Sequence, residues 1–152
     1  MNGSGARLDR PSAVILRLLP HVKPPPARVL IVGAGKGHEA LALDARGYDV
    51  SVVDHDAKGP VGSVPVVAAR FEDTDFGARF DLICEHGTFC EENRVGYVAA
   101  ASRALRPGGQ LFGAFRVDAS ALMHAFASAF DVVRCSPAGS GGGEIEVVLR
   151  RR

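Results

Sequence analysis

Three glycines at alternate positions follow the first buried-looking apolar run of the chain. Gly33, Gly35 and Gly37 come directly after residues 29–32, and Asp54 comes directly after the next apolar run. Glycine lets the backbone turn sharply and lets a ligand approach it, and a helix that begins there offers free N–H groups. A carboxylate at the end of the second strand can accept hydrogen bonds from both ribose hydroxyls. The pattern therefore predicts a nucleoside-binding site, in preference to a turn whose glycines serve packing alone.

The spacing of these glycines differs from that of a dinucleotide site. A dinucleotide loop reads G-x-G-x-x-G. Here the third glycine comes one residue early, and His38 stands where that pattern has glycine. A dehydrogenase is therefore the least favoured of the enzyme classes that use such a loop.

The pattern G-x-G-x-G instead resembles motif I of the class I S-adenosylmethionine-dependent methyltransferases. "FDLI" at residues 80–83 and "LRPGGQL" at residues 105–111 resemble the fourth-strand and fifth-strand motifs of that superfamily, in the same order. The runs "VLIVGAGKGHEALALDARGYDVSVVD" and "FDLICEHGTFC", followed by Arg94 and Tyr97, are similar to the thiopurine methyltransferase family, which methylates thiols, halides and related soft nucleophiles. The resemblance implies an enzyme that uses S-adenosyl-L-methionine, releases S-adenosyl-L-homocysteine and methylates a thiol or a similar small nucleophile.

The resemblance also implies which residues hold the cofactor. Glu85 would accept hydrogen bonds from the cofactor ammonium, although a solvated strand end is the alternative. Many relatives carry an acid after the third strand where this chain has Arg70, so the adenine contact is expected from the Phe71 ring, from Glu72 or from the backbone alone. The expected cofactor-binding residues are Gly33, Ala34, Gly35, Gly37, Asp54, His55, Arg70, Phe71 and Glu85.

The methyl acceptor is expected beyond the ends of the fourth and fifth strands. His86 is the candidate catalytic base, because histidine exchanges protons near neutrality, and an exposed loop histidine without a role is as compatible with the sequence. Phe89 and Arg116 are the candidate substrate-binding residues; packing on the following helix and a surface arginine are their alternatives. Direct methyl transfer needs no covalent intermediate, so we expect Cys90 to be a small buried hydrophobe, and we expect no metal site.

The surrounding pattern indicates an α/β scaffold that positions these residues. Strands and helices alternate, which is typical of a parallel sheet with right-handed crossovers. The expected strands are residues 29–32, 49–53, 64–69, 80–85 and 110–115, and the expected helices are residues 36–46, 92–105 and 119–129. In the first of these helices, Ala40, Leu41 and Leu43 are expected to face inward.

The last two expected strands, residues 130–135 and 145–150, are separated by a linker too short for a crossover helix. They should therefore form an antiparallel hairpin. The expected fold is a doubly wound, Rossmann-like mixed sheet of about seven strands, parallel except for a C-terminal antiparallel strand. The resemblance places that strand between the fifth and sixth strands.

Length and composition predict one domain, with residues 1–26 as an N-terminal helix and linker and residues 27–152 as the core. The chain has 152 residues, of which 47% are hydrophobic and 23% are charged. A net charge of +1 gives no electrostatic case for nucleic acid or for an anionic membrane, and the three C-terminal arginines are expected to form a solvated tail. The apolar runs are too short to cross a membrane, and three cysteines without metal-site spacing indicate a reduced, cytoplasmic protein.

Two functions of different classes fit this sequence. Compared with the family that it resembles, the chain has a shorter N-terminal arm and shorter insertions after the fifth strand, which roof the substrate site in that family. In an enzyme acting on a small-molecule methyl acceptor, the N-terminal segment or a second subunit, as in a homodimer, would have to cover the site. The alternative is a non-catalytic, cofactor-binding partner or regulatory subunit that keeps the fold.

Overall fold

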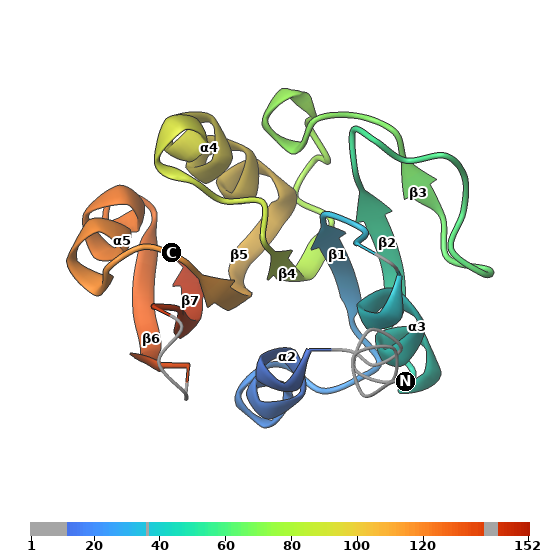
Figure 1. Ribbon diagram of the computed structural model, residues 1–152, viewed down its shortest axis with the longest axis horizontal. Coiled ribbons are helices and arrows are strands. Elements are labelled where there is room, and N and C mark those ends of the chain that lie inside the picture. The colour runs from blue at the N-terminus through green and yellow to red at the C-terminus, as the bar shows by residue number, and fades with distance from the viewer. Residues whose placement is uncertain (1–11, 36, 139–142) are drawn as a thin grey trace, which may run out of the picture.

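One seven-stranded sheet organises the molecule (Figure 1). The structure, a computed structural model, describes residues 12–35, 37–138 and 143–152. The strands are β1 (Arg28–Val32), β2 (Asp49–Val53), β3 (Val66–Val67), β4 (Phe80–His86), β5 (Leu105–Phe115), β6 (Phe130–Pro137) and β7 (Ile145–Arg151). They lie in the order β3-β2-β1-β4-β5-β7-β6, and β7 runs antiparallel to both of its neighbours while the others pair in parallel. The expected mixed sheet, with its last strand between the fifth and sixth, is confirmed.

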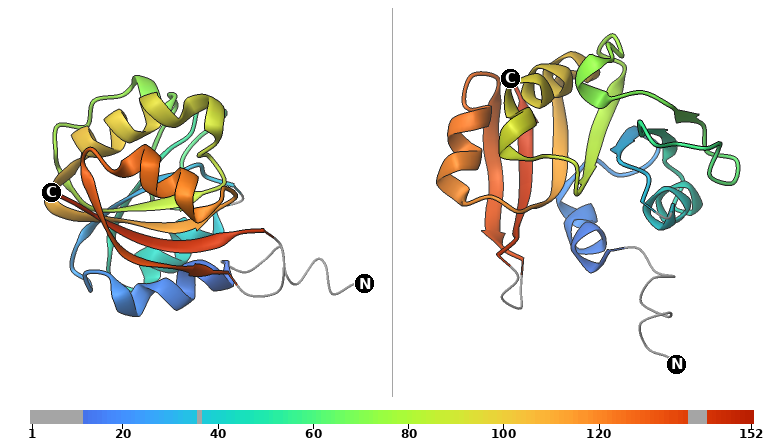
Figure 2. Two further views of the ribbon diagram at one scale, coloured as in Figure 1. Left: turned by 90° about the vertical axis from the view of Figure 1, so that its left-hand side faces the viewer. Right: turned by 45° about the horizontal axis from the view of Figure 1, so that its top comes forward.

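Helices cover both faces of this sheet, which explains why the central strands read as continuous apolar runs. On one face lie α2 (Ala13–Leu18) and α3 (His38–Ala45), and on the other lie α4 (Arg94–Ala104) and α5 (Ala119–Phe126) (Figures 1 and 2). Side chains of β1 alternate between these two cores: Leu30 packs with the α4 side and Ile31 with the α2 side. Among the described residues, no helix is long and apolar enough to cross a membrane.

Four expected elements differ in the structure. Helix α3 turns Ala40 and Leu43 inward, but Leu41 is 46% exposed, because only one face of this short helix reaches the sheet. Strand β3 has two residues rather than six, and α5 ends at Phe126. Strand β5 begins at Leu105, before the expected start, because the "RPGG" stretch forms an irregularity inside the strand: Phe80 pairs with Leu105, whereas Leu82 pairs with Gln110.

The C-terminal arginines are not a solvated tail. The Arg151 guanidinium donates to the Leu105 carbonyl at 2.6 Å. The Arg152 guanidinium binds the Asp131 carboxylate at 2.8 Å and also donates to three backbone carbonyls, those of Ala127, Ser128 and Phe130. These carbonyls lie at and just beyond the end of α5, where a cation satisfies groups that the helix leaves without partners.

At the amino ends of the strands, Asp81 ties three segments together. Its carboxylate accepts the Arg28 backbone N–H at 2.9 Å, Lys23 Nζ at 3.3 Å and the Arg106 guanidinium at 3.1 Å. Burial alone would raise the pKa of Asp81, but these hydrogen bonds and the charges of Lys23 and Arg106 outweigh it and lower that pKa. Asp81 thus stabilises the sheet at the amino ends of its strands, opposite the carboxyl ends that carry the glycine loop.

Two carboxylates hold α2 against the rest of the fold. Glu39 in the first turn of α3 is buried and accepts the Ser12 backbone N–H at 2.6 Å. Glu146 on β7 binds the Arg17 guanidinium at 3.1 Å. Since Ser12 directly precedes α2 and Arg17 lies in its last turn, both ends of this helix are anchored.

Candidate functional site

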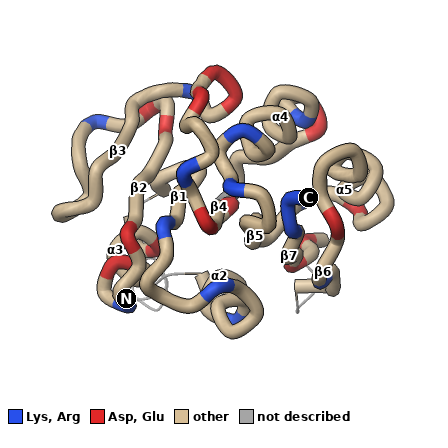
Figure 3. Tube along the Cα trace, turned by 180° about the vertical axis from the view of Figure 1, so that it is seen from behind, with Lys and Arg blue, Asp and Glu red and all other residues tan. Residues whose placement is uncertain are grey.

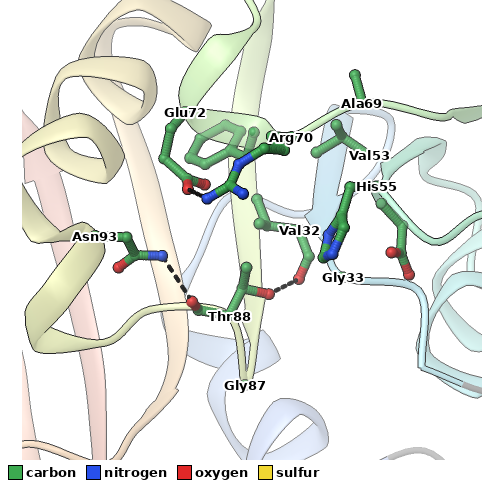
Figure 4. A pocket seen from close by; sticks show the side chains of 12 residues that line it. Val32, Gly33, Val53, His55, Ala69, Arg70, Glu72, Gly87, Thr88 and Asn93 are labelled. Carbon is green, nitrogen blue, oxygen red and sulfur yellow. Dashed lines mark hydrogen bonds and ion pairs between the residues drawn. The ribbon is translucent and has the colours of Figure 1, made fainter.

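Five of the predicted site residues, Gly33, Asp54, His55, Arg70 and Phe71, line a pocket at the carboxyl ends of β1, β2 and β4 (Figure 4). The first pocket, as we name it, has a volume of about 360 Å³. Its lining residues are Val32, Gly33, Val53, Asp54, His55, Ala69, Arg70, Phe71, Glu72, Gly87, Thr88 and Asn93. The chain turns from β1 to one face of the sheet and from β4 to the other, so this is the crevice in which doubly wound sheets bind ligands.

The glycine loop and Asp54 form one side of the first pocket. Gly33 has a φ of 88°, a conformation that favours glycine, and its N–H donates to the Val53 carbonyl at 2.9 Å. One Asp54 oxygen accepts the Ala34 N–H and the other accepts the Asp56 N–H, both at 2.9 Å. A carboxylate offers about four acceptor positions, so each oxygen can still accept from a ligand hydroxyl. Asp54 therefore fixes the loop and keeps capacity for a ribose.

The three motif glycines have different surroundings. Ala34 and Gly35 line a neighbouring hollow of about 420 Å³ on the outer side of Asp54. Gly37, by contrast, is buried, and a side chain there would place its Cβ 2.6 Å from a methyl carbon of Val61. Packing and a φ of 86° at the start of α3 account for Gly37, so the described contacts place it against protein rather than ligand.

The opposite wall comes from the segment after β3. The Arg70 guanidinium is exposed and pairs with the Glu72 carboxylate at 3.3 Å, an ion pair visible in Figure 4. Phe71 is buried and packs edge-on against Tyr97, with 5.0 Å between ring centroids. His55 is exposed on the β2 side, where its Nε2 lies 3.3 Å from an Asp56 oxygen. All three proposed adenine contacts, Phe71, Glu72 and the backbone, thus remain available at this wall.

Ligand atoms of Asp54, His55 and Asp56 lie within 4.8 Å of one another. Exposed acidic groups at such separations are common on protein surfaces, and we assign no metal to this cluster.

Glu85 is held by the protein itself. Its side chain is 1% exposed, and one oxygen accepts the backbone N–H groups of Thr88 at 2.6 Å and Phe89 at 2.8 Å. Its other oxygen accepts the Tyr97 hydroxyl at 2.5 Å. Gly113 on β5 makes room for this residue, because a Cβ there would lie 2.9 Å from Glu85 Cβ. These contacts give Glu85 a task other than the expected one, namely holding the loop after β4.

The loop after β4 has further fixed points that the sequence reasoning did not identify as site residues. The Thr88 hydroxyl donates to the Val32 carbonyl at 3.0 Å, and Asn93 Nδ2 donates to the Thr88 carbonyl at 3.0 Å (Figure 4). Asn93 Oδ1 also accepts the Cys90 N–H at 2.9 Å. The signal for Asn93 was its position three residues after Cys90 at the start of a helix, where capping side chains occur.

Phe89 takes the packing alternative. Its ring centroid lies 5.1 Å from that of Tyr97, 5.4 Å from that of Phe115 and 5.5 Å from that of Phe126. These are ordinary distances for aromatic pairs in a core. Phe89 therefore anchors the loop to α4 and α5.

A second pocket of about 260 Å³ lies beside the first, on the α2 side of the loop after β4. Its lining residues are Ser12, Ile15, Glu85, Gly87, Ala114, Arg116 and Glu144. Arg116 stands here, as expected for an acceptor-side residue, with its exposed guanidinium 3.4 Å from the Glu144 carboxylate. Gly87 lines both pockets, and a Cβ at Gly87 would meet no protein atom within 4 Å. The two pockets therefore adjoin at Gly87.

The remaining candidates divide as follows. The His86 backbone completes β4, but its side chain lies outside the described residues, so its catalytic role stays a prediction. Cys90 is exposed, which corrects the expectation of a buried residue. Burial, and then the charges of Glu39 and Glu85, raise the pKa of the Cys84 thiol well above its usual range, so this residue is an unreactive part of the core.

Comparison with known proteins agrees with this geometry. A family profile described as "Methyltransferase domain" matches residues 30–113, which includes the glycine loop, Asp54 and the loop after β4. No curated protein compared with the chain is a match.

Three solved structures show the same fold. A TehB-like SAM-dependent methyltransferase from Corynebacterium glutamicum has a TM-score of 0.77 and 19% identity, over 98% of this chain and 92% of that one. The 1,6-didemethyltoxoflavin-N1-methyltransferase of Burkholderia thailandensis, solved with S-adenosylhomocysteine, has a TM-score of 0.75 and 22% identity over 91% and 76%. A protein whose structure describes "Conversion of a Disulfide Bond into a Thioacetal Group during Echinomycin Biosynthesis" has a TM-score of 0.75 and 20% identity over 95% and 83%.

The residues of the first pocket fit a nucleoside-containing cofactor, because Asp54 retains free acceptor positions beside the Gly33 turn and the pocket volume lies within the usual range for small-molecule sites. The family profile covers more than half of the chain. The chain therefore belongs to the family of methyltransferase domains.

Proposed function

We propose that the protein transfers the methyl group of S-adenosylmethionine, held in the first pocket, to a small soft nucleophile that enters through the second pocket. The observation that carries this proposal is the position of Gly87 between the two pockets, with open space where a side chain would stand. A methyl transfer needs donor and acceptor to meet in line within about 3–3.5 Å, and a bare backbone at the junction allows such an approach.

The cofactor supplies a methyl group on a positively charged sulfur, which makes that carbon a strong electrophile. Asp54 would accept hydrogen bonds from the ribose, and Gly33 would allow close backbone approach. On the opposite wall, Phe71 and Ala69 supply apolar surface for the adenine, and Val53 at the end of β2 adds to it. The residues of the chain thus bind and orient the donor.

The second pocket favours a small acceptor. Its volume of about 260 Å³ is below the usual 300–1,000 Å³ of sites for drug-sized ligands. Ile15 and Ala114 give it apolar walls, and the Arg116–Glu144 ion pair stands at its exposed side. In Figure 3, acidic and basic segments are interspersed over the described chain, which supports a small molecule over a polyanion as the acceptor.

The hydrogen bonds that Glu85 already accepts support a soft nucleophile, because this carboxylate is occupied and a soft nucleophile needs little help from a base. Glu85 is an acidic residue of the second pocket and lies two residues before Gly87, where the two pockets adjoin. Both of its oxygens already accept hydrogen bonds from the protein. A thiol needs little help, since part of it is ionised at neutral pH, and His86 remains the candidate base for acceptors that must lose a proton. The similarity to the thiopurine methyltransferase family and the sulfur chemistry of the echinomycin protein support the same class, whereas the Burkholderia relative is an N-methyltransferase.

The test combines an acceptor panel with a matched pair of glycine variants. Formation of S-adenosylhomocysteine is measured with thiols, halides, chalcogen oxyanions, amines and hydroxylated small molecules. Gly87→Ala is compared with Gly77→Ala, because the two glycines have similar φ angles of 73° and 67° and neither added Cβ meets protein within 4 Å. Both variants should lose a similar amount of stability, about 1–2 kcal/mol for an L-residue in this region.

Only Gly87→Ala should also lower kcat/KM for the acceptor, by tenfold or more, while S-adenosylhomocysteine still binds. Equal turnover in the two variants would contradict the junction at Gly87. Activity confined to amines or alcohols would contradict the soft-nucleophile class and leave methyl transfer intact. Tight cofactor binding without turnover on any acceptor would favour the non-catalytic alternative.

A further inference from the structure

Tyr97 contacts two of the segments that line the first pocket, the segment after β3 and the loop after β4. This residue in the first half of α4 is fully buried, with 0% exposure. Its ring packs edge-on against Phe71, in the wall that follows β3, with 5.0 Å between centroids. On the other side it packs edge-on against Phe89, in the loop after β4, at 5.1 Å. One side chain therefore fixes the distance between two segments that line the first pocket.

The Tyr97 hydroxyl reaches the loop after β4 through Glu85. It donates to one Glu85 oxygen, and the other Glu85 oxygen accepts the N–H groups of Thr88 and Phe89. We call this chain of contacts the Tyr97–Glu85 brace. Because Gly87 and Thr88 line the first pocket, the brace determines where that part of the pocket lies.

Burying the Glu85 carboxylate in the brace costs free energy that an apolar core side chain would not cost. A buried carboxylate must be compensated by several good donors, and apolar side chains of similar volume often stabilise a core as well or better. Here the donors include two loop N–H groups and one tyrosine hydroxyl. Burial, followed by the charge of Glu85 and the hydrogen bond to it, raises the pKa of Tyr97 well above its usual value, so the hydroxyl stays a donor.

Gly96, one residue before Tyr97, also brings α4 close to the segment after β3. Gly96 allows the helix to approach Glu72 closely, since a Cβ at Gly96 would lie 3.2 Å from Glu72 Cβ. Glu72 and Phe71 belong to the 3₁₀ turn Phe71–Asp73, which lines the first pocket. The start of α4 therefore supports both the segment after β3 and the loop after β4.

We propose that Tyr97 is a positioning residue for the cofactor, which acts through Glu85 to fix the loop after β4 and through its ring to set the width of the first pocket. The proposal rests on the location of the cofactor proposed above. Tyr97 touches neither the cofactor nor the reacting atoms in this assignment.

The chain offers a matched control for the test. Tyr48 is the other tyrosine, is 5% exposed, and donates its hydroxyl to the Lys23 carbonyl at 3.0 Å, at the edge of the sheet away from the first pocket. Tyr97→Phe and Tyr48→Phe each remove one hydroxyl hydrogen bond and keep the ring. The thermal midpoint, the dissociation constant of S-adenosylhomocysteine by calorimetry, and amide hydrogen exchange are measured for both variants and the parent.

Both variants should melt a few degrees lower than the parent. Tyr97→Phe alone should weaken S-adenosylhomocysteine binding, by about tenfold, and should speed exchange at the Thr88 and Phe89 amides while β1 and β4 stay protected. Phe89→Leu removes the ring contact with Tyr97 but keeps every hydrogen-bond donor to Glu85. It should also weaken S-adenosylhomocysteine binding, and it replaces Tyr97→Phe in the test if that variant does not fold.

The outcomes separate this proposal from the proposed function. A parent protein that does not bind S-adenosylhomocysteine contradicts the cofactor site itself. If the parent binds, an unchanged dissociation constant in folded Tyr97→Phe or Phe89→Leu overturns the positioning role. An equal loss in Tyr48→Phe and Tyr97→Phe also overturns it, because the effect would then reflect general stability.

Discussion

Replacing Asp54 by alanine should loosen the glycine loop and weaken cofactor binding at once. The variant removes the acceptors of two backbone N–H groups, Ala34 and Asp56, each at 2.9 Å. A hydrogen bond to a charged group contributes about 1.5–3 kcal/mol. Because Asp54 is half-buried, we take the lower end of that range, about 3 kcal/mol for the pair. For a domain of this size, that loss corresponds to a fall in Tm on the order of 6–12 °C.

The effect on affinity should be larger than the effect on the loop alone. In the complex the variant also lacks the acceptors for the ribose hydroxyls, and each lost bond of about 1.4 kcal/mol or more raises Kd by about tenfold. We therefore expect S-adenosylhomocysteine to bind Asp54→Ala about a hundredfold or more weakly in calorimetry.

Asp49→Ala is the control for this experiment. Asp49 begins the same strand that Asp54 follows, its side chain is 72% exposed, and it pairs with Arg28 at 3.5 Å. An exposed ion pair of this kind contributes about 0–1 kcal/mol. Binding of S-adenosylhomocysteine by Asp54→Ala within twofold of the parent, at an unchanged Tm, would refute the role given to Asp54 in both the loop and the site.

Two further predictions concern stability. Because hydrogen bonds and positive charges lower the pKa of Asp81 in the folded state, its stabilising effect is complete above its ordinary pKa of 3.8 and is lost as pH falls through the lower, folded value. Melting curves of the parent and of Asp81→Asn between about pH 6 and about pH 2.5 should therefore converge at the acid end; a constant gap in Tm at every pH would contradict this. Arg152→Ala removes the Asp131 ion pair and the donors to three carbonyls near the end of α5, so the free energy of unfolding in urea should fall by about 1–2 kcal/mol while cofactor affinity stays the same. A free energy of unfolding equal to that of the parent would restore the idea of a solvated tail.

The sheet could be predicted from the sequence because its signals are local. Apolar runs separated by helix-length segments, and a short link before β7, are sufficient for seven strands and for the antiparallel hairpin. Boundaries were less accurate where tertiary contacts decide them: the "RPGG" stretch has a turn composition, but pairing of Leu105 with Phe80 draws it into β5. Leu41 faces solvent although its type suggests burial, because the sheet covers only one side of α3.

The candidate site was predictable where one motif carries it. The glycine loop and Asp54 lie together, as the spacing suggests, and Arg116 reaches the second pocket. The roles of Glu85 and Phe89 depend on Tyr97, which lies on the next helix, and no spacing rule reveals that a carboxylate will meet loop N–H groups rather than a ligand. The same holds for Gly37, whose neighbour Val61 lies beyond the next strand.

The position of α2 has a consequence for the chain as it leaves the ribosome. Its apolar side chains Val14, Ile15 and Leu18 belong to a core that includes Phe112 of β5 and Val148 of β7. Since β7 separates β5 from β6, that side of the sheet cannot close until β7 is available. At about 5–20 residues per second, α2 waits on the order of ten seconds before β7 completes this core.

During that interval one part of the nascent chain can already fold while another part cannot. Strands β1, β2 and β4 can pair as soon as they emerge, so the glycine loop can form early. The apolar face of α2, by contrast, is still partly exposed on the incomplete chain, and chaperones bind surfaces of this kind. Translational pausing anywhere between α2 and β7 should therefore lower the yield of this protein, because every such pause lengthens the time before the partner strands of α2 are complete.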